Sequence, residues 1–436
     1  MTRPAPHFPS LVFPQLEGVA LPQFRRVTVE PPPGPPPVED VEAAVAAEIA
    51  RSGALDRLAA GASVAIAVGS RGIAEIPRLA RATVAACRAR GLEPFIVPGM
   101  GSHGGAKAEG QVALLAHLGV TEEACGAPVR SSMEVVELGR TDDGIPAWFD
   151  ANAAAADGVI AINRVKAHTS FDRANESGIV KMLAVGLGKH RGAVTVHTLG
   201  PRGLAETLPK LAAIILGKAP ILAGIAVVED GKKRVCHVEA VPPEAFFERD
   251  AALLKLAKSL HAKLPFEAFD ALIVQEIGKD VSGAGMDLAV CGRADIRGIP
   301  NPPPLIRKIG VLGLTEATAG NAVGLGVADF STVDVVSRVD LFATYTNALT
   351  AGTMERVRMP VILPSDLDVF RACAKTSWRP TPEESRMVVI RSTLHVADIA
   401  VSVPLLEETM ERLTLAGEPV PWAPEFDSDG RFTNRL

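Results

Sequence analysis

The feature that most constrains the fold is a repeated alternation of short apolar segments with helical patterns. The apolar segments, rich in β-branched residues, lie at 63–70, 94–100, 133–139, 157–165 and 221–230. The helical patterns lie between them, at 38–52, 74–91, 106–118, 177–187 and 204–216. Strands that are apolar throughout are typical of a parallel sheet covered by helices on both faces. The sequence therefore predicts an α/β domain over residues 41–264.

A second alternation follows a helical stretch at 243–263. Its apolar segments are 270–277, 308–314, 359–363 and 386–392, and its helical patterns are 319–328, 333–350 and 365–374. We predict a second α/β domain over residues 265–398. The expected fold class is thus two α/β domains, each a mostly parallel sheet flanked by helices, with the active site in the interdomain cleft or at strand carboxyl ends.

The two ends of the chain have different patterns. The first forty residues are rich in proline and end in P-P-P-G-P-P-P (31–37), which suits neither a helix nor a central strand. We expect residues 1–40 to form an extended arm on the surface. Residues 399–436 contain a helical pattern at 406–413, and we expect this segment to pack back on the first domain.

Composition excludes several classes of protein. There are 45 Lys and Arg against 50 Asp and Glu, with one Tyr and three Trp, so nucleic-acid binding is not expected. Five scattered cysteines without a C-x-x-C pair suggest neither a disulfide framework nor a zinc site. The start lacks a secretory h-region, and Lys218 and Pro220 interrupt the longest apolar stretch. We expect a cytoplasmic enzyme or small-molecule binder without a membrane span.

Residues with chemical potential follow the first two strands. Ser70 and Arg71 lie in V-G-S-R-G-I at a turn that opens a helix, where backbone N–H groups and a guanidinium favour an anion. His103 lies in the glycine-rich turn G-M-G-S-H-G-G-A, which no G-K-[ST] follows, so it is not a P-loop. A surface arginine and a flexible turn that happens to hold a histidine remain the alternative interpretations.

A second group follows the strand at 157–165. His168 lies in R-V-K-A-H-T-S-F, and the segment E-S-G-I-V-K then leads to Lys181 in an apolar helical stretch. A lysine desolvated there would have a lowered pKa and could be modified covalently, although it could also extend to the surface. The sequence Lys189-His190-Arg191 is interpreted as a solvated basic turn.

Taken together, these residues resemble the nickel-dependent lactate racemase family. The resemblance covers residues 60–200 and rests on G-S-H at His103, on His168, on S-G-x-x-K ending at Lys181, and on a histidine 16 positions later. It implies a nickel-pincer nucleotide, pyridinium-3-thioamide-5-thiocarboxylic acid mononucleotide, tethered to a lysine through a thioamide, with one histidine completing Ni(II) coordination. The roles implied are Lys181 as tether, His197 as metal ligand, His103 and His168 as acid/base residues, and Ser70, Arg71, Ser177 and Gly178 as cofactor contacts.

The resemblance also implies a reaction. A racemase or epimerase of a 2-hydroxy acid removes a hydride from the carbinol carbon and returns it to the opposite face, while a histidine takes the hydroxyl proton. Two histidines are expected, one for each enantiomer, and a pKa near 6.5 suits both donation and acceptance. The implied partners are the small-molecule substrate and the proteins that build the cofactor.

The chain departs from the family pattern at several positions. It has S-G-I-V-K at 177–181 where S-G-G-R-K is usual, and Val68 where lactate racemases carry an aspartate. The family's Q-x-x-K is not recognisable after Gln275, so Lys279 is the candidate for the substrate-binding lysine, beside Arg71. Trp378 is a poor match for a family tryptophan. These departures favour a divergent homologue whose 2-hydroxy acid is not lactate.

Three other functions remain open. A nicotinamide dehydrogenase would need a G-x-G-x-x-G turn after a strand, which is missing. A non-catalytic carrier or binder of a nucleotide-like cofactor is consistent with the missing basic residue before Lys181. A metal hydrolase would use His103, His168 and His197 as a zinc triad, although no carboxylate is well placed as its base.

Overall fold

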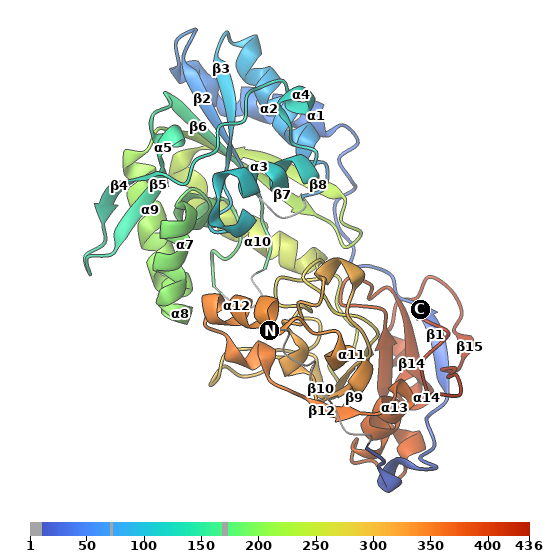
Figure 1. Ribbon diagram of the computed structural model, residues 1–436. Coiled ribbons are helices and arrows are strands. Elements are labelled where there is room, and N and C mark those ends of the chain that lie inside the picture. The colour runs from blue at the N-terminus through green and yellow to red at the C-terminus, as the bar shows by residue number, and fades with distance from the viewer. Residues whose placement is uncertain (1–10, 70–72, 168–172) are drawn as a thin grey trace. The chain divides into compact units, whose positions relative to one another are not determined.

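The computed structural model describes residues 11–69, 73–167 and 173–436, and it divides into two compact units. One unit is residues 32–261, and the other, called the terminal unit here, is residues 1–31 together with 262–436. Each unit is α/β, with helices against a mainly parallel sheet (Figure 1). The predicted class of two α/β domains, each with a mostly parallel sheet flanked by helices, is therefore confirmed.

The 32–261 unit is built on a five-stranded sheet with the order β3-β2-β6-β7-β8. The strands are β2 (Ser63–Val68), β3 (Glu93–Pro98), β6 (Gly158–Arg164), β7 (Ile221–Glu229) and β8 (Val235–Val241). The first four in spatial order are parallel, and β8 is antiparallel to β7. Four of these strands lie where the apolar segments predict them, because a strand buried on both faces carries an unbroken apolar signal.

Helices cover both faces of this sheet. The helices are α1 (Val41–Ser52), α2 (Ile76–Ala89), α3 (Ala108–His117), α4 (Glu122–Cys125), α5 (Ala151–Ala154), α6 (Ile179–Lys181), α7 (Lys189–Thr198), α8 (Gly200–Arg202), α9 (Leu208–Lys218) and α10 (Phe246–Leu260). Along β2, Val64 and Ile66 pack in one core with α1, α2 and α3, while Ala65 and Ala67 pack in another with α7, α9 and α10. Two π-helical segments, η4 (Met182–Gly186) and η5 (Gly203–Thr207), interrupt the helices after α6 and α8.

One predicted strand of this unit lies outside the main sheet. The segment predicted at 133–139 becomes β4 (Val135–Arg140), which pairs antiparallel with β5 (Pro146–Asp150) in a separate two-stranded sheet. Its polar residues explain the difference, since Glu137 and its neighbours leave much of β4 partly exposed. A half-exposed hairpin suits this pattern better than a central parallel strand does.

The terminal unit contains an eight-stranded sheet with the order β12-β11-β10-β9-β13-β14-β1-β15. Its strands are β1 (Phe24–Thr28), β9 (Ala268–Val274), β10 (Leu305–Val311), β11 (Phe330–Thr332), β12 (Val361–Leu363), β13 (Met387–Ile390), β14 (Asp398–Ser402) and β15 (Val420–Trp422). The strands from β12 to β13 in spatial order are parallel, and β14, β1 and β15 continue antiparallel. Its helices are α11 (Val333–Ser337), α12 (Leu341–Ala351), α13 (Asp366–Lys375) and α14 (Val403–Thr409).

Both ends of the chain belong to this sheet, which differs from what we expected of them. Residues 24–28 of the expected surface arm form β1, where Phe24 and Val27 are buried and Val27 pairs with Ile399 of β14. Residues 399–436 supply β15 and most of β14 to the same sheet instead of packing on the first domain. The prolines that suggested an arm follow β1 at 31–37, so they do not interrupt its hydrogen bonds.

Other general properties bear on the sequence predictions. No helix within the described ranges is long and apolar enough to cross a membrane. All five cysteines are buried and free, and burial raises the pKa of Cys87 and Cys291 to about 12. The cysteines are therefore part of the packed core and are poor nucleophiles.

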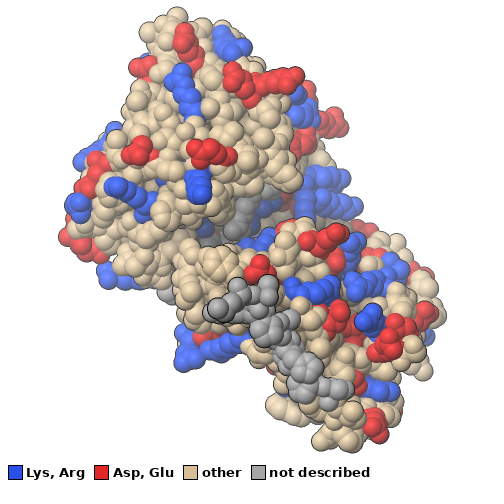
Figure 2. Space-filling model, in the orientation of Figure 1, with Lys and Arg blue, Asp and Glu red and all other residues tan. Residues whose placement is uncertain are grey.

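The surface charge is mixed. On the face shown in Figure 2, acidic and basic side chains are interspersed among neutral ones.

Candidate functional site

The candidate site lies at the carboxyl ends of β2, β3 and β6. These strands are adjacent and parallel, and Val68 at the end of β2 is in register with Pro98 of β3 and Ile162 of β6. Ligands of open α/β sheets bind at this edge, because the loops that follow the strands converge there. Of the predicted site residues that follow these strands, Ser70, Arg71 and His168 lie outside the described residues.

The helical stretch that carries Lys181 packs against this edge. A Cβ added to Gly99, after β3, would lie 2.5 Å from the Met182 sulfur, and one added to Gly186 would lie 2.6 Å from it. A Cβ on Gly69, after β2, would meet the Met182 methyl at 3.4 Å. The small residues therefore let η4 approach the ends of β2 and β3 closely. Lys181, which directly precedes Met182, is half-buried.

Two backbone hydrogen bonds and one from a side chain attach this stretch to β6 and to the residues just after it. The Lys166 N–H donates to the Ser177 carbonyl at 2.7 Å, and the Ser177 N–H donates back to the Lys166 carbonyl at 3.3 Å. The Asn163 side-chain amide donates to the Gly178 carbonyl at 2.7 Å. Lys166 and Ser177 are thus adjacent, and Ser177 and Gly178 are fixed by their backbones beside the end of β6.

The glycine-rich turn that carries His103 is also fixed by its backbone. The Gln111 side-chain amide donates to the carbonyls of Gly101 at 2.9 Å and His103 at 3.3 Å, and the His103 N–H donates to Met100. Gly104 has a φ of 66°, and a Cβ there would lie 2.5 Å from the backbone of Gly110. The turn therefore packs directly on α3, and the half-buried His103 side chain starts from a defined backbone.

A hydrogen bond joins this turn to the Lys181 stretch. The Gly101 N–H donates to the Gly186 carbonyl at 3.0 Å. The structure thus brings the segments of His103, Lys181, Ser177 and Gly178 to one edge of the sheet. His197 lies in the last turn of α7, about 12 Å along the helix from Lys189, where it is half-buried.

Lys189 is a residue of this region that the sequence analysis interpreted wrongly. His190 and Arg191 are exposed, as a solvated turn requires, but Lys189 is 0% exposed. Its ammonium group donates to the Pro98 carbonyl at 2.6 Å and to Gln111 Oε1 at 3.1 Å, and pairs with Asp150 Oδ2 at 2.9 Å. Desolvation lowers the pKa of Lys189, and the Asp150 carboxylate opposes this effect.

The Lys189 contacts reach the turn of His103. Lys189 contacts Gln111, and Gln111 in turn holds the carbonyls of Gly101 and His103. Asp150, also 0% exposed, pairs with the lysine and accepts the Ala153 N–H at 2.9 Å. A buried cation needs such partners because its lost hydration must be replaced. No sequence signal marks Lys189, because its partners come from distant parts of the chain.

Glu229 is a second residue that the sequence analysis missed. It lies at the end of β7 with a side chain that is 6% exposed, pairs with Arg164 of β6, and accepts the Ala74 N–H at 2.7 Å. It therefore connects the ends of β6 and β7 to Ala74, which lies shortly before α2. A carboxylate at a strand end is the only sequence signal that marks it.

Lys279, the candidate substrate lysine, belongs to the terminal unit. It follows β9, is half-buried, and donates through its ammonium group to the Gly283 carbonyl at 2.8 Å. Its N–H donates to Thr318 Oγ1 at 3.0 Å, so the backbone there is also held. Nearby Gln275 is 1% exposed and accepts the Leu436 N–H. Trp378, the poor match for a family tryptophan, is 77% exposed.

The described part of the chain has no ready-made metal site built from side chains alone. There, no group of three or more His, Cys, Asp or Glu side chains is arranged to hold a metal ion. The zinc triad includes His168 and so falls partly outside these residues. A pincer nucleotide supplies carbon and sulfur donors of its own and needs one imidazole, so it does not require such a group.

Comparisons with known proteins give a likeness to solved structures but no match by sequence. No family model and no curated protein matches the sequence. Among solved structures, the lactate racemase apoprotein from Thermoanaerobacterium thermosaccharolyticum is similar, with a TM-score of 0.48 and 13% sequence identity. The alignment covers 85% of this chain and 99% of that chain. A likeness of this degree assigns neither a family nor an activity.

Proposed function

We propose that this chain is an isomerase that inverts the carbinol carbon of a 2-hydroxy acid with the help of a nickel-pincer nucleotide on Lys181. The observation that carries the proposal is the hydrogen bond of 3.0 Å from Gly101 to Gly186. It joins two segments that the sequence motif singled out separately, the turn of His103 and the helical stretch of Lys181. An acid/base histidine and an attachment lysine of such an enzyme need to serve one site.

The described residues are chemically suited to this cofactor. Lys181 supplies an amine for a thioamide link, and the imidazole of His197 supplies a nitrogen ligand for Ni(II) beside the sulfur donors of the nucleotide. Around Gly105, beside His103, a Cβ would meet nothing within 4 Å, so this part of the turn is open. When bound, the cofactor would accept and return the hydride of the substrate.

The remaining chemistry falls to the side chains of the protein. We assign proton transfer at the substrate hydroxyl to His103 for one enantiomer and to His168 for the other. Arg71 would bind the substrate carboxylate through two parallel hydrogen bonds. Gln111 would keep the His103 turn in place through the two carbonyls that it contacts.

The first test is covalent loading. The protein is co-produced with the enzymes that build the cofactor, and its intact mass and nickel content are measured. We expect an adduct on Lys181 and about one nickel per chain, and no adduct after Lys181→Ala. Lys232→Ala is the matched control, because Lys232 is an exposed lysine of the β7–β8 turn. A wild-type protein without an adduct, or an adduct that persists in Lys181→Ala, would refute the proposal.

The second test is turnover. Loaded protein is screened against single enantiomers of 2-hydroxy acids by chiral chromatography. For the substrate found, His103→Ala should lower kcat by roughly 10²- to 10⁴-fold, the usual contribution of an acid/base residue. His117→Ala, an exposed histidine at the end of α3, should retain full activity. Loaded protein that binds a ligand but inverts no 2-hydroxy acid would instead support the carrier function.

A further inference from the structure

A carboxylate occupies the space beside the glycine of the S-G-x-x-K segment. A Cβ added to Gly178 would lie 1.9 Å from Asp250 Oδ1 and 2.7 Å from its Cγ. Asp250 belongs to α10 and is 1% exposed. Glycine is therefore required at position 178 so that this side chain can approach the backbone.

The Asp250 carboxylate caps the helical stretch of Lys181. Its Oδ1 accepts the Ile179 N–H at 2.8 Å, and its Oδ2 accepts from the Asn175 side-chain amide at 3.3 Å. Gly178 is the N-cap residue of α6 and has no side chain that could do this. The first N–H groups of a helix need an acceptor. For Ile179 this acceptor is the carboxylate of Asp250, which lies 71 positions later in the sequence.

The environment of Asp250 makes this arrangement costly for the fold. Desolvation raises the pKa of Asp250 to about 6, although the hydrogen bonds from Ile179, Asn175 and Val180 act to lower this pKa. The other acid nearby, Glu176, adds repulsion but is itself paired with Lys258 at 2.5 Å. An apolar residue would avoid the cost of desolvation but would leave the Ile179 N–H without its acceptor.

We propose that Asp250 is a positioning residue for Lys181. By accepting the Ile179 N–H, its carboxylate fixes the position at which α6 begins, and Lys181 follows Ile179 by two residues. The α6 turn spans only Ile179–Lys181 before the π-helical segment, so its own hydrogen bonds cannot fix it. This inference rests on the proposed function of Lys181 as the attachment residue, and it gives Gly178 the role of admitting the carboxylate.

The test uses full-length protein without cofactor, so its first result does not depend on the proposed function. Amide hydrogen exchange is measured for Asp250→Leu and Asp250→Asn. Leu removes the acceptor, and exchange at Ile179 should become about 2- to 30-fold faster, the usual effect of losing a cap. Asn keeps an oxygen at the same place and should restore exchange to within about twofold of wild type. Ala153, which Asp150 caps, is the matched control and should not change.

The second readout is Lys181 itself. Pulse labelling with acetic anhydride should modify Lys181 faster in Asp250→Leu by a similar factor, with exposed Lys232 as the reference. On co-production with the cofactor-building enzymes, the loaded fraction should fall in Asp250→Leu and recover in Asp250→Asn. Unchanged exchange at Ile179 and unchanged labelling in Asp250→Leu would overturn the inference.

The two proposals can fail separately. If exchange and labelling respond as expected but wild-type protein never carries an adduct, the link between Asp250 and Lys181 is supported and the proposed function is refuted. If Asp250→Leu does not fold, Gly178→Ala provides the same test, because its methyl group would displace the carboxylate. Removal of the carboxylate in Gly178→Ala/Asp250→Ala should relieve this clash, and a double variant no more stable than Gly178→Ala would contradict the inference.

Discussion

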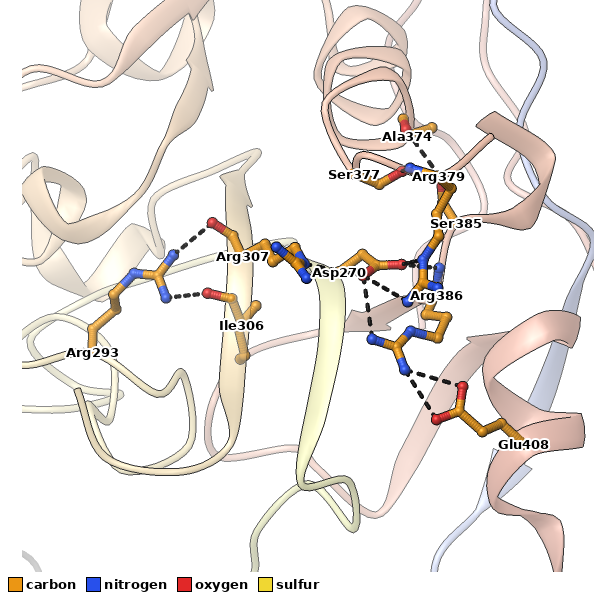
Figure 3. A network of polar contacts seen from close by, with 10 residues as sticks. All are labelled: Asp270, Arg293, Ile306, Arg307, Ala374, Ser377, Arg379, Ser385, Arg386 and Glu408. Atoms are coloured by element: carbon orange, nitrogen blue, oxygen red, sulfur yellow. Dashed lines mark hydrogen bonds and ion pairs between the residues drawn. The ribbon is translucent and has the colours of Figure 1, made fainter. Parts of the chain in front are cut away.

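Two buried carboxylates, one in each unit, are neutralised in different ways. Asp150 of the 32–261 unit is paired with Lys189 alone among the described ion pairs, and both side chains are 0% exposed. Asp270 of the terminal unit is also 0% exposed, but three guanidinium groups approach it, as Figure 3 shows. These belong to Arg379 at 2.8 Å, Arg386 at 3.4 Å and Arg307 at 3.5 Å.

The difference lies in access to water. The three arginine side chains around Asp270 are between 16% and 48% exposed, and Arg386 also reaches Glu408 (Figure 3). Burial alone would raise the pKa of Asp270, but the hydrogen bonds from Arg379 and Arg386 outweigh it and the pKa is lowered. At Lys189 desolvation prevails instead. A buried charge with several half-exposed partners therefore tolerates losing one, while a fully enclosed pair does not.

The largest expected effect is that of Lys189→Met. The variant keeps the volume of the side chain but leaves Asp150 buried without its cation, which typically costs about 3–5 kcal/mol of unfolding free energy. Urea denaturation of wild type and variant gives this value directly. Because Lys189 also contacts Gln111, we expect the variant that still folds to load less cofactor.

The double variant Lys189→Met/Asp150→Asn is the control. It removes both charges, so most of the lost stability should return. A single variant that loses less than about 1 kcal/mol would mean that the Lys189–Asp150 pair is not enclosed from water, and the contrast with Asp270 would disappear.

A smaller effect is expected for Arg379→Met. The carboxylate of Asp270 keeps Arg386 and Arg307, so the loss should be roughly 1–2 kcal/mol, comparable with one hydrogen bond to a charged group. The lowered pKa of Asp270 means that the network stabilises the fold above the pKa of the unfolded carboxyl, about 3.9, and that this contribution is lost as pH falls through the folded pKa. The variant and wild type should therefore differ at pH 7 and converge in acid. A loss as large as that of Lys189→Met would show that the arginines do not substitute for one another.

The smallest effect is expected for an exposed pair. Asp334 lies in α11, and Arg338 directly follows this helix. A guanidinium nitrogen of Arg338 is 2.9 Å from Asp334 Oδ2, and the two side chains are 48% and 57% exposed. Arg338→Ala should change the unfolding free energy by less than about 1 kcal/mol, and added salt should reduce the difference further. A larger, salt-independent loss would show that the site is less hydrated than its exposure indicates.

Some parts of the fold follow directly from local sequence. The strands β2, β3, β6 and β7 lie where the apolar segments predict them, because burial on both faces leaves a strong local signal. The short strands β12 and β13 also fall within the predicted segments 359–363 and 386–392, but other short strands were missed. The three residues of β11 lie between two predicted helices, and β1 lies in a segment that proline made unlike a strand. The predicted helix at 333–350 is interrupted before Asp340, which caps α12.

The candidate site likewise has a part that local sequence predicts and a part that it does not. Neighbouring residues alone identify the glycine turn of His103 and the S-G-x-x-K segment. The sequence by itself therefore determined that both follow strands of one sheet. The burial of Lys189, the cap from Asp250 and the place of β1 were decided only by the tertiary structure. Each depends on residues far apart in the chain, such as the 91 positions between Lys189 and Pro98, and no local pattern reports which distant partner will replace lost water.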